Sequence, residues 1–335
     1  MVLPLRNLGS LSSTAIAFGC MNLSHAYNVA PPEEEAVALL NHALDAGMTM
    51  FDTAALYGGG GNERLLAKAV MHRRKEFVLA SKCVLDMIDG KRVLDGRPET
   101  ITASLERSLQ RLGTDYIDLY YLHRLDRNVP IEESMGALVR AKEAGKIGHI
   151  GVSEMSAATI RCAHAVHPLT AVQSEYSICV RNPEVAVLEA CRELGIGFVA
   201  FSPLMRGLLA DAVHNDAYAP GDIRHMMPRF TEPNLSTNLT IISAYNRLAR
   251  DLDITPSQLA LAWVLSRGDH IVALPGTQSQ RHLDENLGAA SIMLDSATLA
   301  NIEGLFAPGA LLGDRYPPQM QAQIDTELLP EEVAP

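Results

Sequence analysis

Four side chains that could share one reaction occur at or just beyond the ends of three short apolar segments. They are Asp52, Tyr57, Lys82 and His123. A tyrosine is a weak acid with an ordinary pKa of about 10, and a neighbouring ammonium lowers that pKa by stabilising the phenolate. Lys82 can supply the ammonium, Asp52 can keep Lys82 charged, and His123 can orient a carbonyl oxygen. This set predicts a proton donor aimed at an oxygen that becomes negative.

The same side chains include no hydride donor, so the predicted reaction needs a cofactor that brings one. A metal site is the other chemistry that Asp52 and His123 could serve. The sequence contains no HxH or HExxH spacing that would support such a site. A single tyrosine or histidine at a strand end more often belongs to the packing or the surface, whereas four such groups after three successive strands favour catalysis.

The segments that carry these residues belong to a repeated alternation of strand and helix. Four predicted helices end at a glycine, which tolerates the left-handed conformation of a helix end, and a short apolar run follows each one. Eight such runs are strand candidates: residues 14–19, 48–52, 77–81, 116–122, 147–152, 171–173, 197–201 and 270–274. This pattern predicts an α/β fold, a parallel (β/α)8 TIM barrel with its reactive side chains at the C-terminal strand ends. An open doubly wound sheet is the alternative, but it would usually bring a GxGxxG turn, and none is present.

Three further segments complete the expected domain, which spans residues 1–335 without a linker. Residues 2–9 are expected to pair with residues 12–16 as a hairpin that closes the barrel floor. Residues 203–238 form a long irregular insert after the seventh strand, and loops of this length are usually functional or disordered. The acidic, Pro-rich tail beyond about residue 308 is expected to be partly loose.

The composition of the chain restricts its partners. A net charge of −11 disfavours nucleic acid and anionic membrane surfaces. The sequence has no secretory signal and no apolar run long enough to span a membrane, so we expect a cytoplasmic protein. The five cysteines show no CxxC spacing and are expected to be free thiols. The oligomeric state leaves no readable signal in the sequence.

Five motifs, in the same order along the chain, resemble the aldo-keto reductase superfamily. They are "GMTMFDTAALYGGGGNERLLAKAV", "LASKC", "LGTDYIDLYYLHRLD", "GHIGVSE" and "LPGTQSQRHLDENLGA". The stretch after the histidine and the "GVSE" motif further resemble a bacterial, yeast and plant branch that includes pyridoxal reductases and perakine reductase. The resemblance implies a barrel that binds NADPH without a Rossmann domain and reduces an aldehyde or ketone.

The resemblance also implies roles for individual residues. Asp52, Tyr57, Lys82 and His123 match the catalytic tetrad, with Tyr57 as the general acid. Ser153 and Gln173 match groups that hold the nicotinamide carboxamide, and Phe201 matches the aromatic residue that stacks on the nicotinamide ring. The full set of implied cofactor contacts is Gly19, Cys20, Met21, Asp52, Ser153, Gln173, Phe201, Ser202, Pro203, Leu204, Gly207, Gly276, Thr277, Gln278, Ser279, His282, Glu285 and Asn286. The four glycines at 58–61 are then a turn that lets Tyr57 reach inward, and not a phosphate cradle.

The chain departs from the family pattern at three positions. Glu154 stands where many members have Asn, which puts its contact with the carboxamide in doubt. Gln278 and His282 stand where many NADPH-dependent members have basic residues. A 2′-phosphate favours positive charge, so NADPH is the expected cofactor and NADH the alternative.

The sequence says less about the substrate and the direction of the reaction than about the fold and the cofactor. The pocket is expected to be lined by residues 22–27, 84–97, 124–127 and 205–230, with the tail as a further candidate, which suits a mid-sized, partly apolar carbonyl compound. Arg124 and Arg127 could attract an anion, but ion pairs with Asp126 or Glu132 are the favoured interpretation. Two other functions stay open. One is a cofactor-binding sensor, like the potassium-channel β-subunits that resemble this family, and the other is alcohol oxidation.

Overall fold

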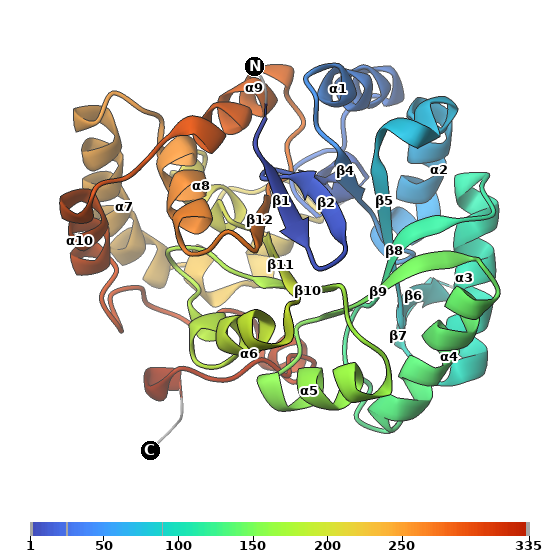
Figure 1. The fold of residues 1–335 in the computed structure, drawn as a ribbon. Helices are drawn as coiled ribbons and strands as arrows, with labels where there is room; N and C mark the ends of the chain where they lie inside the picture. The colour runs from blue at the N-terminus through green and yellow to red at the C-terminus, as the bar shows by residue number, and fades with distance from the viewer. Residues whose placement is uncertain (1–2, 25, 89, 333–335) are drawn as a thin grey trace.

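A computed structural model describes residues 3–24, 26–88 and 90–332 of the chain. Eight parallel strands form a barrel with helices around it (Figure 1). In their order around the barrel, the strands are β3 (Phe18–Gly19), β4 (Met50–Asp52), β5 (Val78–Cys83), β8 (Ile117–Leu122), β9 (Ile147–Ser153), β10 (Ala171–Glu175), β11 (Gly197–Phe201) and β12 (Ile271–Leu274). The amide of Ala17 donates to the carbonyl of Ala273 at 2.9 Å, and the amide of Gly19 donates to that of Pro275 at 3.0 Å. These bonds complete the ring, and the predicted (β/α)8 fold is confirmed.

All eight predicted strand segments contain a strand, but the first is shorter than expected. Of residues 14–19, Phe18 and Gly19 form β3, Ile16 makes a single bridge to Ala273 of β12, and Thr14 belongs to the preceding hairpin. That hairpin joins β1 (Leu5–Leu8) to β2 (Leu11–Thr14) and crosses in front of the barrel in Figure 1. Its predicted first residue, Val2, lies outside the described residues.

The hairpin fills one end of the barrel through Leu8, which is fully buried among side chains of the barrel interior. A Cβ atom on Gly197 would lie 2.4 Å from the Cα of Leu8, so only glycine leaves room at that position. The C-terminal strand ends, which carry the predicted reactive residues, lie at the other end of the barrel. The hairpin therefore closes the floor of the barrel, and the opposite end, the mouth, is open for the candidate site.

The helices form an outer layer around the strands. They are α1 (Glu33–Asp45), α2 (Gly61–Ala69), α3 (Pro98–Leu112), α4 (Ile131–Glu143), α5 (Ala157–Val166), α6 (Val187–Leu194), α7 (Asn234–Asp251), α8 (Pro256–Ser266), α9 (Gln280–Gly288), α10 (Ser296–Leu305) and α11 (Pro318–Gln321). Short 3-10 helices are η1 (Cys20–Leu23), η2 (Tyr57–Gly60), η3 (Met71–Glu76), η4 (Asn182–Glu184), η5 (Met205–Ala210), η6 (Ile223–Met226), η7 (Pro228–Phe230), η8 (Ala289–Ser291) and η9 (Pro330–Glu332).

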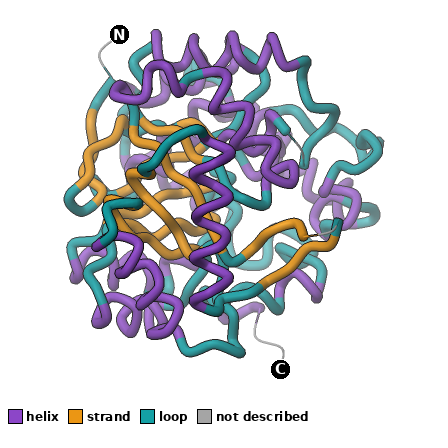
Figure 2. The backbone as a smooth tube through the Cα atoms, turned by 90° about the vertical axis from the view of Figure 1, so that its right-hand side faces the viewer, coloured by secondary structure: helices purple, strands orange, loops and turns teal. Residues whose placement is uncertain are grey.

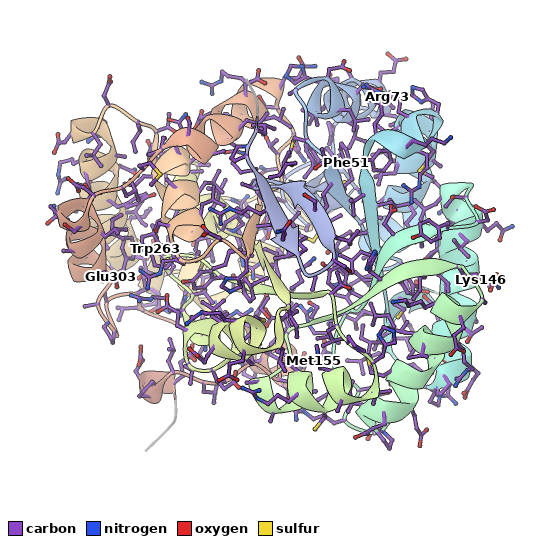
Figure 3. All side chains as sticks on the ribbon, viewed as in Figure 1. Phe51, Arg73, Lys146, Met155, Trp263 and Glu303 are labelled. Carbon is purple, nitrogen blue, oxygen red and sulfur yellow. The ribbon has the colours of Figure 1, made fainter. Side chains whose placement is uncertain are left out.

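Helix α3 shows why these segments fold as they do. Pro98 occupies its first turn, where a missing N–H costs little, and Gly113 ends it with a φ of 66°. Its apolar side chains recur every three or four residues and are buried against α2, α4 and β5. Between strands and helices, the core is dense with aromatic contacts, such as those of Phe51 with Phe18 and Phe77. Figure 3 shows Phe51 inside the molecule, whereas the charged Arg73 and Lys146 extend at its periphery.

A second antiparallel hairpin follows β5 and was not predicted. It pairs β6 (Leu85–Ile88) with β7 (Lys91–Leu94), and Figure 2 shows it standing apart from the barrel strands. The sequence does contain a signal for it, because an Asp-Gly dipeptide separates two four-residue runs. The hairpin lies above the mouth, directly after Lys82, and so it shapes the site.

The insert and the tail are more ordered than expected. The insert contains η5, η6 and η7, and α7 already begins at Asn234. In the tail, Arg315, Tyr316 and Ile324 are buried, and the amide of Asp325 donates to the carbonyl of Glu154 at 3.0 Å. The tail, expected to be partly loose, is therefore fastened to the end of β9.

Two other predictions concern bulk properties. Within the described residues, no helix combines the length and the apolar character that crossing a membrane requires. All five cysteines are free thiols, as expected, and three of them are buried.

Candidate active site

The four predicted catalytic side chains meet at the mouth of the barrel. Asp52 ends β4, Lys82 lies near the end of β5, His123 directly follows β8 and Tyr57 opens η2. Lys82 Nζ forms an ion pair with Asp52, and it donates to the carbonyl of Thr53 at 2.9 Å and to the Tyr57 hydroxyl at 3.3 Å. The rings of Tyr57 and His123 meet edge to face, with their centroids 5.8 Å apart. All four side chains are buried.

Burial and charge act in opposite directions on this cluster. Burial lowers the pKa of Lys82, but Asp52 and Tyr57 outweigh burial and raise it above its ordinary value. The ammonium therefore stays charged. For Tyr57, burial is the largest effect and raises the pKa, and the charge of Lys82 offsets it only in part. Lys82 does lower this pKa, as the sequence predicts, but burial outweighs the ion and the net shift is upward.

The glycines after Tyr57 form a tight left-handed turn. Gly58, Gly59 and Gly60 have φ values of 57°, 58° and 82°, which side chains with a Cβ rarely adopt. A Cβ on Gly60 would also lie 2.6 Å from the side chain of Arg111. The turn lets the chain place Tyr57 inward and then enter α2 at once.

A cavity of about 1160 Å³ extends from this cluster to the start of α9. It is lined by every residue that the sequence assigned to the cofactor, from Gly19 on β3 to Asn286 on α9. Lys82 lies behind the wall, fully buried, while Asp52, Tyr57 and His123 reach the lining. Two residues of the predicted pocket segments, His25 and Asp89, lie outside the described residues.

The part of the cavity beside the tetrad has a polar end and an aromatic wall. The Gln173 side-chain amide donates to Asp52 Oδ2 at 2.8 Å, so this residue fixes the second oxygen of the tetrad carboxylate. Ser153 accepts from the Arg124 guanidinium at 3.3 Å, and Phe201 lies in the wall at the end of β11. These three residues, from successive strands, surround one compartment.

The far part of the cavity is suited to anionic groups. Ser279 caps α9 by accepting from the amide of His282, and the amides of a helix N-terminus attract negative charge. Arg281 adds a cation there and contacts His282 at 2.9 Å. Gln278 donates to the carbonyl of Asn22 at 2.8 Å, which joins the start of α9 to the loop after β3.

The loop after β11 is strained where it borders the cavity. Ser202, Met205 and Arg206 have positive φ values of 50°, 45° and 55°, although none is a glycine. Gly207 follows with a φ of 95°. Such strain persists only where the surroundings hold it in place.

A buried ionic network that the sequence analysis missed holds this loop. Glu175 accepts from Arg206 at 2.8 Å, from Arg315 at 2.9 Å and from the Tyr316 hydroxyl at 2.8 Å. Arg315 also donates to Glu154 at 2.6 Å. Burial alone would raise the pKa of Glu175, but Arg206 and Arg315 lower it to about 2. No local signal could have found this network, because its members are far apart in sequence.

Glu154 is part of this network and does not line the cavity. It has a φ of 54°, and its carboxylate also accepts from the amide of Glu175 at 2.6 Å. Because Glu154 does not line the cavity, its position agrees with the doubt, raised by the sequence, that it contacts the nicotinamide carboxamide. The expected ion pairs of the 124–127 loop are wrong, since Arg127 pairs with Asp325 at 3.1 Å and Arg124 lines the cavity.

No group of three or more His, Cys, Asp or Glu side chains within the described parts of the chain could hold a metal ion. The cluster brings a tyrosine hydroxyl and a lysine ammonium to the edge of a large cavity.

Comparisons with known proteins agree with this architecture. The model of the aldo/keto reductase family matches residues 15–307. A Schizosaccharomyces pombe protein named as an NADP(+) aldo-keto reductase is 42% identical over 342 residues, which cover 99% of this chain and 100% of that protein. A probable aldo-keto reductase of Glycine max is 41% identical over 308 residues, which cover 90% of this chain and 88% of that protein.

Solved structures show the same fold. The glycerol dehydrogenase of Gluconobacter oxydans superposes with a TM-score of 0.82 at 25% identity, covering 98% of both chains. An aldo-keto reductase of Bacillus halodurans superposes with a TM-score of 0.75 at 26% identity, covering 91% of this chain and 96% of that one. Because the family model spans most of the sequence and both curated relatives match at 41% identity or more, this chain belongs to the aldo/keto reductase family of oxidoreductases.

Proposed function

We propose that this chain reduces an aldehyde or ketone to an alcohol with NADPH, and that Tyr57 is the general acid. The observation that carries the proposal is the Tyr57 hydroxyl, which contacts the buried ammonium of Lys82 in a cavity large enough for a dinucleotide and a substrate. The name of the Schizosaccharomyces pombe relative, which includes NADP(+), supports the choice of cofactor.

The bound cofactor supplies the hydride that attacks the carbonyl carbon. The residues of the chain act on the carbonyl oxygen of the substrate. His123 orients it, and Tyr57 donates a proton to it as negative charge develops. Lys82 stabilises the phenolate that remains, and Asp52 keeps Lys82 charged. Burial raises the pKa of Tyr57 above its ordinary value, so the hydroxyl carries its proton at neutral pH, as a general acid must.

The residues around the cavity suit a nicotinamide dinucleotide. Ser153 and Gln173 would hold the carboxamide, and Phe201 would stack on the ring. The adenine end would lie near Glu285 and Asn286, with the phosphates between. Arg281, with Thr277 and Ser279, would receive a 2′-phosphate. NADPH is therefore favoured over NADH, although Gln278 and His282 stand where basic residues are common.

Alcohol oxidation is the second candidate function, because the structural relative from Gluconobacter oxydans is named a glycerol dehydrogenase. The same four side chains would then act in reverse, with Tyr57 as the base. A base with a raised pKa is largely protonated at neutral pH, so oxidation would speed up as the pH rises.

The test is consumption of NADPH and of NADH with 4-nitrobenzaldehyde and with pyridoxal, followed by absorbance. Replacing Tyr57 by Phe removes the proton but keeps the ring, so turnover should fall at least a hundredfold while the cofactor dissociation constant changes little. Tyr116→Phe is the matched control, because Tyr116 lies on the outer surface of the barrel. If the Tyr57→Phe enzyme kept wild-type turnover, the assignment of the general acid would be wrong.

A further inference from the structure

Two arginines reach the active-site cavity close to the predicted proton donor. Arg92 lies on β7, opposite Met87 on β6, and residues opposite each other in a hairpin share one face. Both line the cavity. Arg124 directly follows His123, donates to the His123 carbonyl at 2.6 Å and also lines the cavity. The substrate end of the cavity therefore carries two positive charges.

Neither arginine forms an ion pair with any residue in the described ranges. The acidic residues nearby are already engaged. Asp86 on β6 pairs with Arg107 at 2.8 Å, and Asp95 after β7 pairs with Arg97 at 2.6 Å. Asp126 accepts from the amides of Gly96 and Asn128, both at 3.0 Å. Arg97 and Arg107 are thus paired with the acids of this rim, whereas no ion pair within the described residues involves the two arginines that face the cavity.

The positive charge at this position is unfavourable without a ligand. Burial lowers the pKa of Arg92, and the charge of Arg124 lowers it further, which shows that the two guanidinium groups repel each other. The hairpin that carries Arg92 also presents the apolar Leu85 and Met87 to the cavity. An anion between the two arginines would remove the repulsion and complete their hydrogen bonds.

The phosphates of the proposed cofactor are not that anion. In the barrel, β5 and β8 lie together, and β9 and β10 separate β8 from β11 and β12. The loop after β11 and the start of α9 border the opposite side of the mouth, where Arg281 and the α9 amides lie. Arg92 and Arg124 are instead grouped with Tyr57 and His123, where the carbonyl compound must lie.

We propose that the substrate is a carbonyl compound with an anionic group, a carboxylate or a phosphate, that binds between Arg92 and Arg124 while its apolar body lies along Leu85 and Met87. This inference rests on the proposed function and specifies its substrate class. A guanidinium binds either oxyanion through two parallel N–H···O bonds, which fixes the distance between the anion and the reacting carbonyl.

The test compares 4-carboxybenzaldehyde with its neutral methyl ester, and pyridoxal 5′-phosphate with pyridoxal. Wild-type kcat/KM should be at least tenfold higher for one charged aldehyde than for its neutral partner. The pair that shows the larger ratio identifies the anion as a carboxylate or a phosphate. Arg92→Gln should reduce that ratio about tenfold, mainly through KM, because a charged hydrogen bond is lost. Arg92→Lys, which keeps the charge, should restore part of the ratio.

Lys91→Gln is the matched control, because it removes the same charge one residue away at a position that does not line the cavity. Its ratio should equal that of the wild type. If the wild type reduced the neutral aldehydes but showed no preference for either anion, or if Lys91→Gln lowered the ratio as much as Arg92→Gln, the inference would be overturned and the proposed function would stand. Absence of turnover with all four aldehydes would overturn both.

Discussion

In the proposed mechanism, Tyr57 is a weak acid and Lys82 is the charged group that adjusts its strength. Burial raises the pKa of the tyrosine, and the ammonium 3.3 Å from its hydroxyl limits the rise. Burial lowers the pKa of the lysine, but Asp52, which is in contact with it, and Tyr57 together outweigh burial and raise that pKa above its ordinary value. The three groups are therefore interdependent, and removing one changes the charge state that the others can hold.

Lys82→Met tests this dependence. It leaves Asp52 as a buried carboxylate without its cation, which should cost about 3–5 kcal/mol of unfolding free energy and abolish turnover. Urea denaturation and NADPH consumption measure the two effects. The double variant Lys82→Met with Asp52→Asn removes the unpaired charge and should recover most of the stability without recovering activity. Recovery of activity in the double variant would contradict the role given to Lys82.

The C-terminal tail and the loop after β11 are joined by one buried carboxylate. Glu175, at the end of β10, binds Arg206 of η5 on one side and Arg315 of the tail on the other. Tyr27 adds a further contact, since its hydroxyl accepts from Arg206 at 3.0 Å. The strained backbone of residues 202–207 is thus held by a segment more than 100 residues away in the sequence. The tail is in this way a structural support of the proposed cofactor loop.

Arg315→Met should weaken that support. The change leaves Glu154 and Glu175 with one cation fewer in a buried site, and we expect a loss of about 3 kcal/mol in stability. Amide hydrogen exchange should become faster in residues 202–211 and 309–332, and the KM for NADPH should rise. Arg127→Met is the control, because the Arg127 side chain is 60% exposed and Asp325 keeps its hydrogen bonds from Ser156 and Thr159 without it, so the loss should be about 1 kcal/mol or less. Unchanged exchange in residues 202–211 would show that the tail does not hold the loop.

The same network links the stability of the whole protein to pH. Its two cations lower the pKa of Glu175 from 4.5 to about 2 in the folded state. A carboxyl group whose pKa falls on folding stabilises the protein above its unfolded pKa, and this contribution is lost as the pH falls through the folded pKa.

Glu175 should therefore contribute about 3 kcal/mol at pH 7, decreasing between pH 4.5 and pH 2. Glu175→Gln removes the titrating group, so its stability should depend less on pH in this window than that of the wild type. Urea midpoints at pH 7, 4.5, 3 and 2 measure the difference, and Glu133→Gln on the exposed side of α4 is the control. Parallel curves for wild type and Glu175→Gln would refute the assignment.

The local pattern of the chain was sufficient to predict the barrel and the meeting of the four candidate catalytic side chains at its mouth. Strand and helix alternate with clear apolar runs and glycine helix ends, and a parallel barrel gathers strand ends at one mouth. For this reason Asp52, Lys82 and His123 could be placed together, and the residues assigned to the cofactor all line one cavity.

Only the tertiary structure decided the ion-pair partners and the pKa shifts that depend on contacts between distant segments. The partners of Glu175 come from the insert and the tail, and Arg127 pairs with Asp325 of the tail, although closer acids such as Asp126 lie in its own loop. The direction of the Tyr57 pKa shift depends on how much of the cavity wall covers the hydroxyl. Ion pairing and burial are properties of the folded surroundings, and no spacing in the sequence records where a long loop or a tail will pack.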